Sequence, residues 1–379
     1  MSLNNLFDNK KYDLKYVISL IIIPMMGIFG TIFYALNHGI KWQEPILLIL
    51  FWIITGLSIT IGYHRLFAHR SFKSHPLLDW ILMIFGAAAL ENSALKWCSD
   101  HRRHHKHLDT DKDPYSITKG FFHAHMGWIL ENKPSPLEKI NDLEKNPALK
   151  FQDKHYNLLF IIFGVLIPMS LGFFWGRPFG ALFWGVFLRI TLVHHFTYFI
   201  NSLCHYIGTK PYNSECTSRD SWFMALLTFG EGFHNYHHKF QWDYRNGIRW
   251  FDFDPSKWII WLCSKVGLAK ELKKANFIQI MKAKSKNKWN QIYLCLDRMP
   301  KKMKRVHEKK LSIINHKIQS IEKSLMKFDK KINYNLLKNN SSKKLNNIYQ
   351  NKIKFLQIEY ASQLKSLSLL LFTVQKTHP

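Results

Sequence analysis

The sequence predicts an all-α membrane protein with four transmembrane helices, a cytosolic helical cap and a basic, C-terminal helical extension. Three observations support this class. Hydrophobic residues make up 47% of the 379 residues, and most of them are gathered in long runs. Lysine and arginine collect in only some of the loops between these runs. The C-terminal part of the chain repeats its apolar residues at helical spacing.

Four apolar runs are long enough to cross a lipid bilayer as helices. They cover Tyr16–Leu36, Pro45–Tyr63, Asn157–Trp175 and Phe179–Ile200. Only residues 176–178 join the last two runs, so we expect an antiparallel helical hairpin there. A further apolar run, Pro76–Leu90, has about 15 residues, which is short for a full crossing. We expect it to form a buried or interfacial helix.

The basic residues predict the orientation of the spans. Lysine and arginine are frequent in the N-terminal tail, in residues 64–156 and after residue 200, whereas loops 37–44 and 176–178 carry one each. Loops rich in lysine and arginine stay on the cytosolic side of a membrane. We therefore expect a multi-pass protein with both termini in the cytosol. A bacterial inner membrane is favoured, with the endoplasmic reticulum as the alternative.

Three short histidine clusters lie beside the predicted spans, all on the cytosolic side. Their spacings are HxxxxH, HxxHH and HxxHH, and residues three or four apart share one face of a helix. Imidazole nitrogens suit iron, zinc or copper rather than magnesium or calcium. Eight ligands are too many for one tetrahedral zinc, so the pattern predicts two metal ions. The eight histidines are His64, His69, His101, His104, His105, His234, His237 and His238.

The C-terminal segment carries most of the positive charge. From Lys270 onward there are 26 lysines and arginines against 6 acidic residues, and the whole chain has a net charge of +27. A basic surface suits nucleic acid or anionic lipid. Beside membrane spans we expect the partner to be the lipid bilayer, and we expect no nucleic acid.

Apolar residues in the same segment recur at alternating steps of three and four, from Leu311 to Ile332 and again from Tyr349 to Leu371. This spacing predicts two helices, and the polar residues 338–344 between them predict a turn. We expect an antiparallel coiled-coil hairpin, with a pair of helices on the membrane surface as the alternative. The expected organisation is a cytosolic tail over 1–15, a four-span domain over 16–270, a linker over 271–300 and the hairpin over 301–379.

The five cysteines are widely scattered and include no CxxC pair. We therefore expect reduced thiols rather than a disulfide or zinc framework. The first apolar run is long and lacks a small-residue cleavage motif, so we expect no cleavable signal peptide.

The histidine strings also carry a resemblance to a known family. GYHRLFAHRSFK, DHRRHHKHLDTDKDPY and GEGFHNYHHKF, beside four spans, are similar to the integral-membrane fatty-acid desaturases of the acyl-CoA delta-9 (stearoyl-CoA) branch. The likeness covers about residues 12–270. It implies a centre of two iron ions that uses O2 as co-substrate. It also implies a ninth ligand, His205, and a contact of Asn201 with iron through a water, from the family's Asn-x-x-x-His motif. Spacing alone leaves His205 undecided.

The resemblance further implies a bent tunnel that holds one methylene pair of an acyl chain near the iron. Trp97 and Thr197 match family residues around the bend. Glu91 stands where the family has a glutamine, and Tyr198 where it has a tryptophan.

Acidic residues near the clusters have two interpretations. A carboxylate that accepts the free imidazole N–H can orient a metal-binding histidine. We expect this role for Asp100 and Glu231. For Asp109 and Asp113, a surface or capping role is an equal alternative.

The acyl carrier and the electron donor remain open at this point. Family members that act on acyl-CoA have basic residues where this chain has Ser99 and Asn132. Arg102, Arg103 and Lys133 are candidates for binding the head group, so a fatty acyl-CoA or an acyl-lipid substrate fits. The chain has neither an HPGG string nor a GxGxxG fingerprint. We therefore expect an external electron donor of the ferredoxin or cytochrome b5 type.

Together with these observations, the resemblance implies a desaturase that inserts a cis double bond, at the delta-9 position, into a saturated acyl chain. One alternative is a fatty-acyl or alkane hydroxylase on the same kind of di-iron site. Another is a histidine-rich metal transporter, although transporters keep polar ligands within their spans and these clusters lie at span ends. A third is that the basic tail is itself a nucleic-acid-binding or lipid-binding module.

Overall fold

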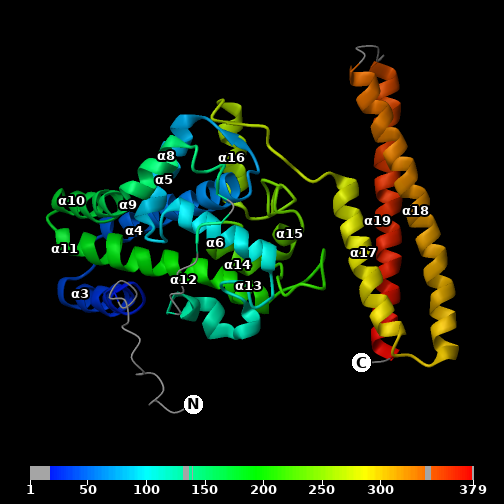
Figure 1. Ribbon diagram of the computed structural model, residues 1–379, viewed down its shortest axis with the longest axis horizontal. Helices are drawn as coiled ribbons and strands as arrows, with labels where there is room; N and C mark the ends of the chain where they lie inside the picture. The colour runs from blue at the N-terminus through cyan, green and yellow to red at the C-terminus, as the bar shows by residue number, and fades with distance from the viewer. Residues whose placement is uncertain (1–17, 131–135, 139, 338–342, 378–379) are drawn as a thin grey trace. The chain divides into compact units, whose positions relative to one another are not determined.

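The computed structural model describes residues 18–130, 136–138, 140–337 and 343–377 (Figure 1). This part of the chain is mostly helical, and the only strands in it are the antiparallel pair β1 (Lys73–Ser74) and β2 (Ala269–Lys270). The predicted all-α class is confirmed. The chain divides into two compact units, Met1–Thr209 with Cys216–Lys274, and Lys210–Glu215 with Ala275–Pro379.

Four helices are long and apolar enough to cross a membrane, as the sequence predicts. They cover Ile18–His38, Gln43–Ala68, Tyr156–Phe173 and Pro178–Tyr206. Each is built from consecutive segments, and several of these have π-helical hydrogen bonding. The segments are η2 (Ile18–Ile22), α2 (Ile23–Met25), η3 (Met26–Gly30), α3 (Thr31–His38), α4 (Gln43–Leu57), η4 (Ser58–Ala68), α9 (Tyr156–Leu159), η7 (Phe160–Leu166), α10 (Ile167–Phe173), α11 (Pro178–Ala181), η8 (Leu182–Leu188), α12 (Arg189–Asn201) and α13 (Leu203–Tyr206).

The second span continues beyond the end of its apolar run. The run stops at Tyr63, but η4 extends to Ala68, and the backbone N–H of His69 donates to the carbonyl of His64 at 3.1 Å. All residues of η4 are buried. The first histidine cluster therefore lies at a buried helix end.

Short helices between the second and third spans and after the fourth span form the cap. They are α5 (Pro76–Ala88), α6 (Ala94–His107), η5 (Ile117–Lys119), η6 (His123–Gly127), α7 (Trp128–Leu130), α8 (Pro147–Lys154), α14 (Trp222–Leu227), α15 (His234–Lys239) and α16 (Pro255–Lys265). The apolar run after the second span forms α5, a helix of 13 residues. Side chains of Ser93, Asn146 and Asp254 accept backbone N–H groups at the starts of α6, α8 and α16.

One apolar core joins η4, α5 and α6. Tyr63, Met83 and Cys98, one from each helix, are fully buried in it. A Cβ built on Gly86 would lie 2.4 Å from the Tyr63 ring, so α5 approaches η4 at a distance that only glycine allows. This packing holds the two helices that carry the first and second histidine clusters against each other.

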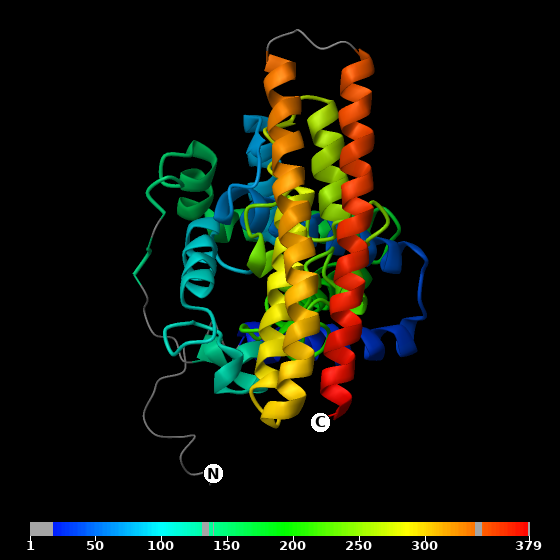
Figure 2. The same ribbon diagram turned by 90° about the vertical axis from the view of Figure 1, so that its right-hand side faces the viewer.

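The second unit is a bundle of three helices, α17 (Phe277–Leu296), α18 (Lys301–Leu337) and α19 (Lys343–Thr377) (Figures 1 and 2). The predicted apolar stripes of α18 and α19 face each other, and their buried residues include Leu311, Ile318, Ile321, Leu325, Leu356, Tyr360, Leu364, Leu367 and Leu371. Two helices side by side therefore occur as predicted.

The structure differs from the sequence prediction over residues 271–300. We expected a linker there, but α17 occupies residues 277–296 and begins with a capping box between Asn276 and Gln279. Ile292 and Leu296 of α17 are fully buried in the same core as α18 and α19. The extension is therefore a three-helix bundle, in which α17 packs beside the predicted pair α18 and α19. The boundaries proposed for the domains remain predictions.

Candidate metal centre

Four helical segments bring the histidines together. Three of them carry the clusters that the sequence singles out, because histidines three and four apart lie on one face of a helix. The segments and their histidines are the end of η4 with His64 and His69, α6 with His101, His104 and His105, α13 with His205, and α15 with His234, His237 and His238.

The nine histidines form two groups. His64, His69, His101, His105 and His237 make the first, and His104, His205, His234 and His238 make the second. Within each group, one nitrogen of every ring lies within 4.8 Å of those of all the others. His105 of the first group stacks on His238 of the second, with ring centroids 4.3 Å apart. The groups are therefore neighbours, as two adjacent metal sites would be.

The Nε2 atoms point inward and crowd one another. In the first group, the Nε2 atoms of His64 and His237 lie 3.0 Å apart. In the second group, the Nε2 atoms of His205 and His234 also lie 3.0 Å apart. Two neutral rings satisfy such a contact only if one of them carries its proton on Nε2. A cation in each group would satisfy all of the inward lone pairs.

The outward Nδ1 atoms have their own partners, which decide where the protons lie. A carboxylate oxygen of Glu231 is 2.9 Å from Nδ1 of His64, and one of Asp113 is 2.9 Å from Nδ1 of His104. A carboxylate accepts a hydrogen bond, so each Nδ1 carries the proton and each Nε2 is left as a ligand. This donor set fits two transition-metal ions such as iron, zinc or copper.

For His205, a hydroxyl group rather than a carboxylate accepts the hydrogen bond from Nδ1. Thr217 donates its hydroxyl proton to Asp109 at 2.5 Å, so its oxygen is free to accept from Nδ1 of His205 at 2.7 Å. The phenol oxygen of Tyr115 lies 3.3 Å from Nδ1 of His101. Neither Thr217 nor Tyr115 was among the predicted site residues. The string around the second cluster contains Tyr115, but no sequence pattern points to Thr217.

The electrostatic surroundings keep the rings neutral. Burial lowers the pKa of His101, His105 and His237 well below the ordinary histidine value, and neighbouring histidines lower it further. The same causes lower the pKa of His234 and His238. Neutral imidazole is the form that binds metal.

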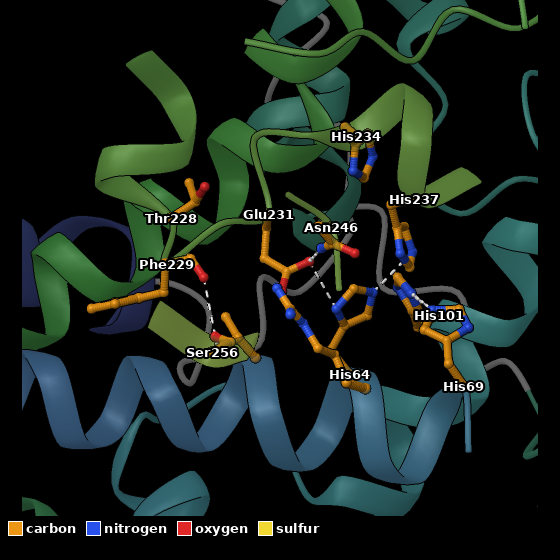
Figure 3. A network of polar contacts seen from close by, with 12 residues as sticks. His64, His69, His101, Thr228, Phe229, Glu231, His234, His237, Asn246 and Ser256 are labelled. Carbon is orange, nitrogen blue, oxygen red and sulfur yellow. Dashed lines mark hydrogen bonds and ion pairs between the residues drawn. The ribbon is translucent and has the colours of Figure 1, made fainter. Parts of the chain in front are cut away.

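Glu231 belongs to a buried ionic network behind the first group (Figure 3). Its carboxylate contacts Arg65 at 2.9 Å and accepts from the amide of Asn246 at 2.6 Å. Arg65 also pairs with Asp254 at 2.9 Å. Burial raises the pKa of Glu231, but its interactions with His64 and Arg65 outweigh burial, and the net shift is downward. Glu231 is therefore ionised when it contacts His64.

A cavity of about 1170 Å³ leads from the spans to the histidines. Apolar residues of the spans, such as Ile23 and Trp52, line one part of it, and His64, His101 and His234 line another. All four predicted tunnel residues border the same cavity, namely Glu91, Trp97, Thr197 and Tyr198. Asn201, which was predicted to contact iron through a water, also borders it.

Glu91 connects two of these tunnel residues. Its carboxylate accepts hydrogen bonds from the indole N–H of Trp97 at 3.2 Å and from the hydroxyl of Thr197 at 2.7 Å. Trp97 in turn stacks on the ring of His101, with centroids 4.9 Å apart. Burial raises the pKa of Glu91 to about 7, although the two hydrogen bonds oppose the shift.

The other predicted acidic residue, Asp100, is paired with basic side chains. It lies 2.7 Å from the amine of Lys96 and 3.7 Å from the guanidinium of Arg103. Asp113, for which a surface role was an equal alternative, is the carboxylate that contacts His104. Glu231 and Asp113 are thus the two acidic residues that contact histidines of the two groups, and an orienting role for either remains a prediction.

The residues predicted to bind the head group differ in their positions relative to the cavity. Arg103 lines the cavity. Arg102 instead donates to the backbone carbonyls of Phe67 and Ala68 and pairs with Asp142 at 2.7 Å. Lys133 lies outside the described residues. Three further lysines border the cavity that the sequence analysis did not propose, namely Lys96, Lys112 and Lys119.

Comparisons with known proteins agree with this architecture. The model of the family described as "Fatty acid desaturase" matches residues 43–263, which include all nine histidines. Acyl-CoA desaturase 1 of Saccharomyces cerevisiae is 42% identical over 66% of this chain and 50% of its own length. A probable acyl-CoA desaturase of Schizosaccharomyces pombe is 40% identical, over 66% and 52%. The chain thus spans about half the length of these yeast relatives.

A cyanobacterial relative is covered almost completely. The sn-1 stearoyl-lipid 9-desaturase of Anabaena variabilis is 36% identical over 65% of this chain and 90% of its own length. The matched family model covers more than half of the chain and contains both histidine groups. The chain therefore belongs to the fatty acid desaturase family.

Proposed function

We propose that this protein is a membrane-bound fatty-acyl desaturase that inserts a cis double bond at the delta-9 position of a saturated acyl chain. The observation that carries the proposal is the cavity whose walls are apolar within the spans and which ends at the two histidine groups. Relatives named acyl-CoA desaturase and stearoyl-lipid 9-desaturase support the substrate class. The acyl carrier is therefore coenzyme A or a membrane lipid.

The nine histidines and Asn201 would hold two iron ions, and Asn201 would do so through a water. Bound iron supplies the oxidising power, with O2 as co-substrate, that is needed to remove two hydrogens from an unactivated methylene pair. One acyl chain, one O2, two electrons and two protons give one double bond and two waters. Glu231, Asp113 and Thr217 keep the Nδ1 protons of His64, His104 and His205 outward, so that the Nε2 atoms of these three rings remain available.

The tunnel residues position the substrate. The apolar cavity walls align the acyl chain and exclude water from the reacting methylenes. Trp97 and Thr197 are fixed by their hydrogen bonds to Glu91, and together they define the wall near His101. At the polar part of the cavity, Arg103 and the neighbouring lysines would bind the phosphates of the carrier.

The two electrons come from a separate donor of the ferredoxin or cytochrome b5 type. The net charge of +27 suits an acidic partner. The distribution of lysine and arginine supports cytosolic termini in a multi-pass protein. We infer a bacterial inner membrane, with the endoplasmic reticulum as the alternative.

The decisive experiment expresses the chain in an auxotroph for unsaturated fatty acids and maps the double bond by mass spectrometry. We expect growth without supplement and a product two hydrogens lighter, unsaturated at the delta-9 position. His237→Gln should abolish growth. His316→Gln, at an exposed side chain of α18, should not. A product that gains oxygen would indicate a hydroxylase. Metal uptake without O2 consumption would indicate a transporter.

A further inference from the structure

Helix α19 has a second apolar face that the bundle does not cover. Its core face carries residues such as Leu356, Tyr360 and Leu367, which are buried. A helix turns by about 100° per residue, so another set of apolar residues falls within an arc of roughly 120° on the opposite side. This set, the outer stripe of α19, consists of Ile348, Phe355, Ile358, Leu369 and Phe372, which are 55%, 57%, 71%, 60% and 57% exposed.

Lysines surround the outer stripe. Lys352, Lys354, Lys365 and Lys376 are all exposed. The amine of Lys352 lies 5.1 Å from the centroid of the Phe355 ring, and that of Lys376 lies 4.8 Å from the Phe372 ring. Within Lys343–Thr377, Glu359 is the sole acidic residue.

The charge of the bundle selects the kind of partner. Residues 275–379 contain 23 lysines and arginines against 5 acidic residues. A second copy of the chain would bring two such surfaces together, and like charges oppose that contact. An acidic soluble protein would match the lysines but would not require five exposed apolar side chains. A basic helix with aromatic and aliphatic residues between its lysines suits the interface of an anionic membrane.

We propose that the outer stripe of α19 binds the surface of a membrane that contains anionic phospholipids. Phe355, Ile358 and Phe372 enter the head-group region, and the lysines contact the lipid phosphates with their stems along the same surface. A bilayer is always part of the surroundings of this chain, because four of its helices are candidate spans. The inference does not depend on the proposed desaturation, since α19 lies beyond the family match at residues 43–263.

Hydroxyl-radical footprinting of the full chain tests the proposal. The protein is placed in nanodiscs of phosphatidylcholine alone, or of phosphatidylcholine and phosphatidylglycerol in equal amounts. We expect oxidation of Phe355, Ile358 and Phe372 to slow several-fold only with the anionic lipid, and raised salt to reverse the effect. Exposed Tyr293 of α17 serves as the unprotected reference, and buried Tyr360 reports whether the bundle is folded.

Matched variants separate the effect of the lysines beside the outer stripe from that of the total positive charge of the bundle. K354Q/K365Q/K376Q removes three lysines from α19 and should abolish the protection. K302Q/K317Q/K327Q removes three exposed lysines from α18 and should keep most of it. A third arm adds anionic vesicles to the zwitterionic nanodiscs, so that binding to a separate membrane is also detected.

Each remaining outcome overturns the proposal. Equal protection in both lipids would mean that another part of the protein, or a second copy, covers the stripe. Lack of protection in the nanodiscs and with added vesicles would mean that α19 does not bind anionic membranes. Equal losses in the two triple variants would mean that only the total charge matters.

Discussion

At the scale of single residues, Asp113 illustrates how one carboxylate can prepare a histidine for metal. It lies 2.9 Å from Nδ1 of His104 and also accepts the backbone N–H of Tyr115 at 3.2 Å. The contact holds the ring in place and keeps its proton away from the inward nitrogen.

Asp113→Asn should therefore weaken metal binding. The new amide can donate to Nδ1 of His104, which would move the ring proton to Nε2 and remove one ligand. We expect metal affinity to fall by about 10–100-fold, measured as iron per chain after purification at limiting iron. Asp111→Asn, at an exposed neighbouring carboxylate, is the control and should keep full occupancy. Equal iron content in the two variants would contradict the assigned role.

The raised pKa of the Glu91 carboxyl group predicts that its contribution to stability depends on pH. Burial raises its pKa from 4.5 to about 7, so the folded protein keeps this proton after the unfolded chain has lost it. The contribution of Glu91 to stability should then fall as pH rises from about 5 to 7, by roughly 3 kcal/mol, whereas the buried histidines contribute with the opposite sign in this range. Glu91→Gln should remove the contribution of Glu91, so that the difference in stability between variant and wild type changes by that amount between pH 5 and 7 in thermal unfolding of the purified protein.

Glu271→Gln is the control, because Glu271 is exposed and pairs with Lys73 at the surface. Its profile should follow that of the wild type. If Glu91→Gln kept the full slope between pH 5 and 7, the carboxyl group of Glu91 would be ionised in the folded protein at pH 5. The assigned burial effect would then be wrong.

The predictability of the site differs from residue to residue. Cluster spacing alone singled out eight of the nine histidines, because each cluster is short and the two HxxHH clusters place histidines three and four residues apart on one helix face. His205 needed the family resemblance, since a single histidine near a span end has no periodic pattern. Thr217 could not be found, because its contact with His205 depends on how the loop after α13 folds back.

At the scale of elements, Arg65 ties η4 to the loops around α15 and α16. It is 1% exposed and contacts Glu231, Asp254 and the backbone carbonyl of Tyr244. These partners come from residues 231–254, far along the chain from η4. The first and third histidine clusters are therefore joined by a buried charge network.

Arg65→Met should destabilise the fold strongly. The substitution leaves two buried carboxylates without their cation, which typically costs about 3–5 kcal/mol. The measurement is thermal unfolding in detergent without added metal. Arg249→Met is the matched control, because the Arg249 side chain is largely exposed. Water screens its pair with the buried Asp252 from the exposed side, and a screened pair contributes about 0–1 kcal/mol. Similar losses in the two variants would contradict the importance of the network.

Elements with long, uniform patterns were predicted well. The four spans and the stripes of α18 and α19 follow directly from apolar runs and periodicity. Helix α17 was missed because Lys282, Lys284, Lys286 and Lys288 interrupt its apolar pattern. The end of η4 was misplaced because its polar residues are buried by tertiary packing rather than by the membrane.

At the scale of the whole molecule, the division into two compact units predicts different results for two C-terminal truncations. Helix α17 shares its core with α18 and α19, so a chain that ends at residue 300 keeps α17 but exposes Ile292 and Leu296. A chain that ends at Lys274 removes the whole bundle except residues 210–215. The family match ends before either cut.

We therefore expect the shorter chain to be more stable and less prone to aggregation than the longer one. The variant that ends at Lys274 should unfold at a temperature close to that of the full chain and should support growth of the auxotroph. The variant that ends at residue 300 should aggregate, because exposed apolar helix faces promote association. Size-exclusion chromatography in detergent and double-bond mapping check both results. If the shorter chain were folded but inactive, the bundle would take part in desaturation itself.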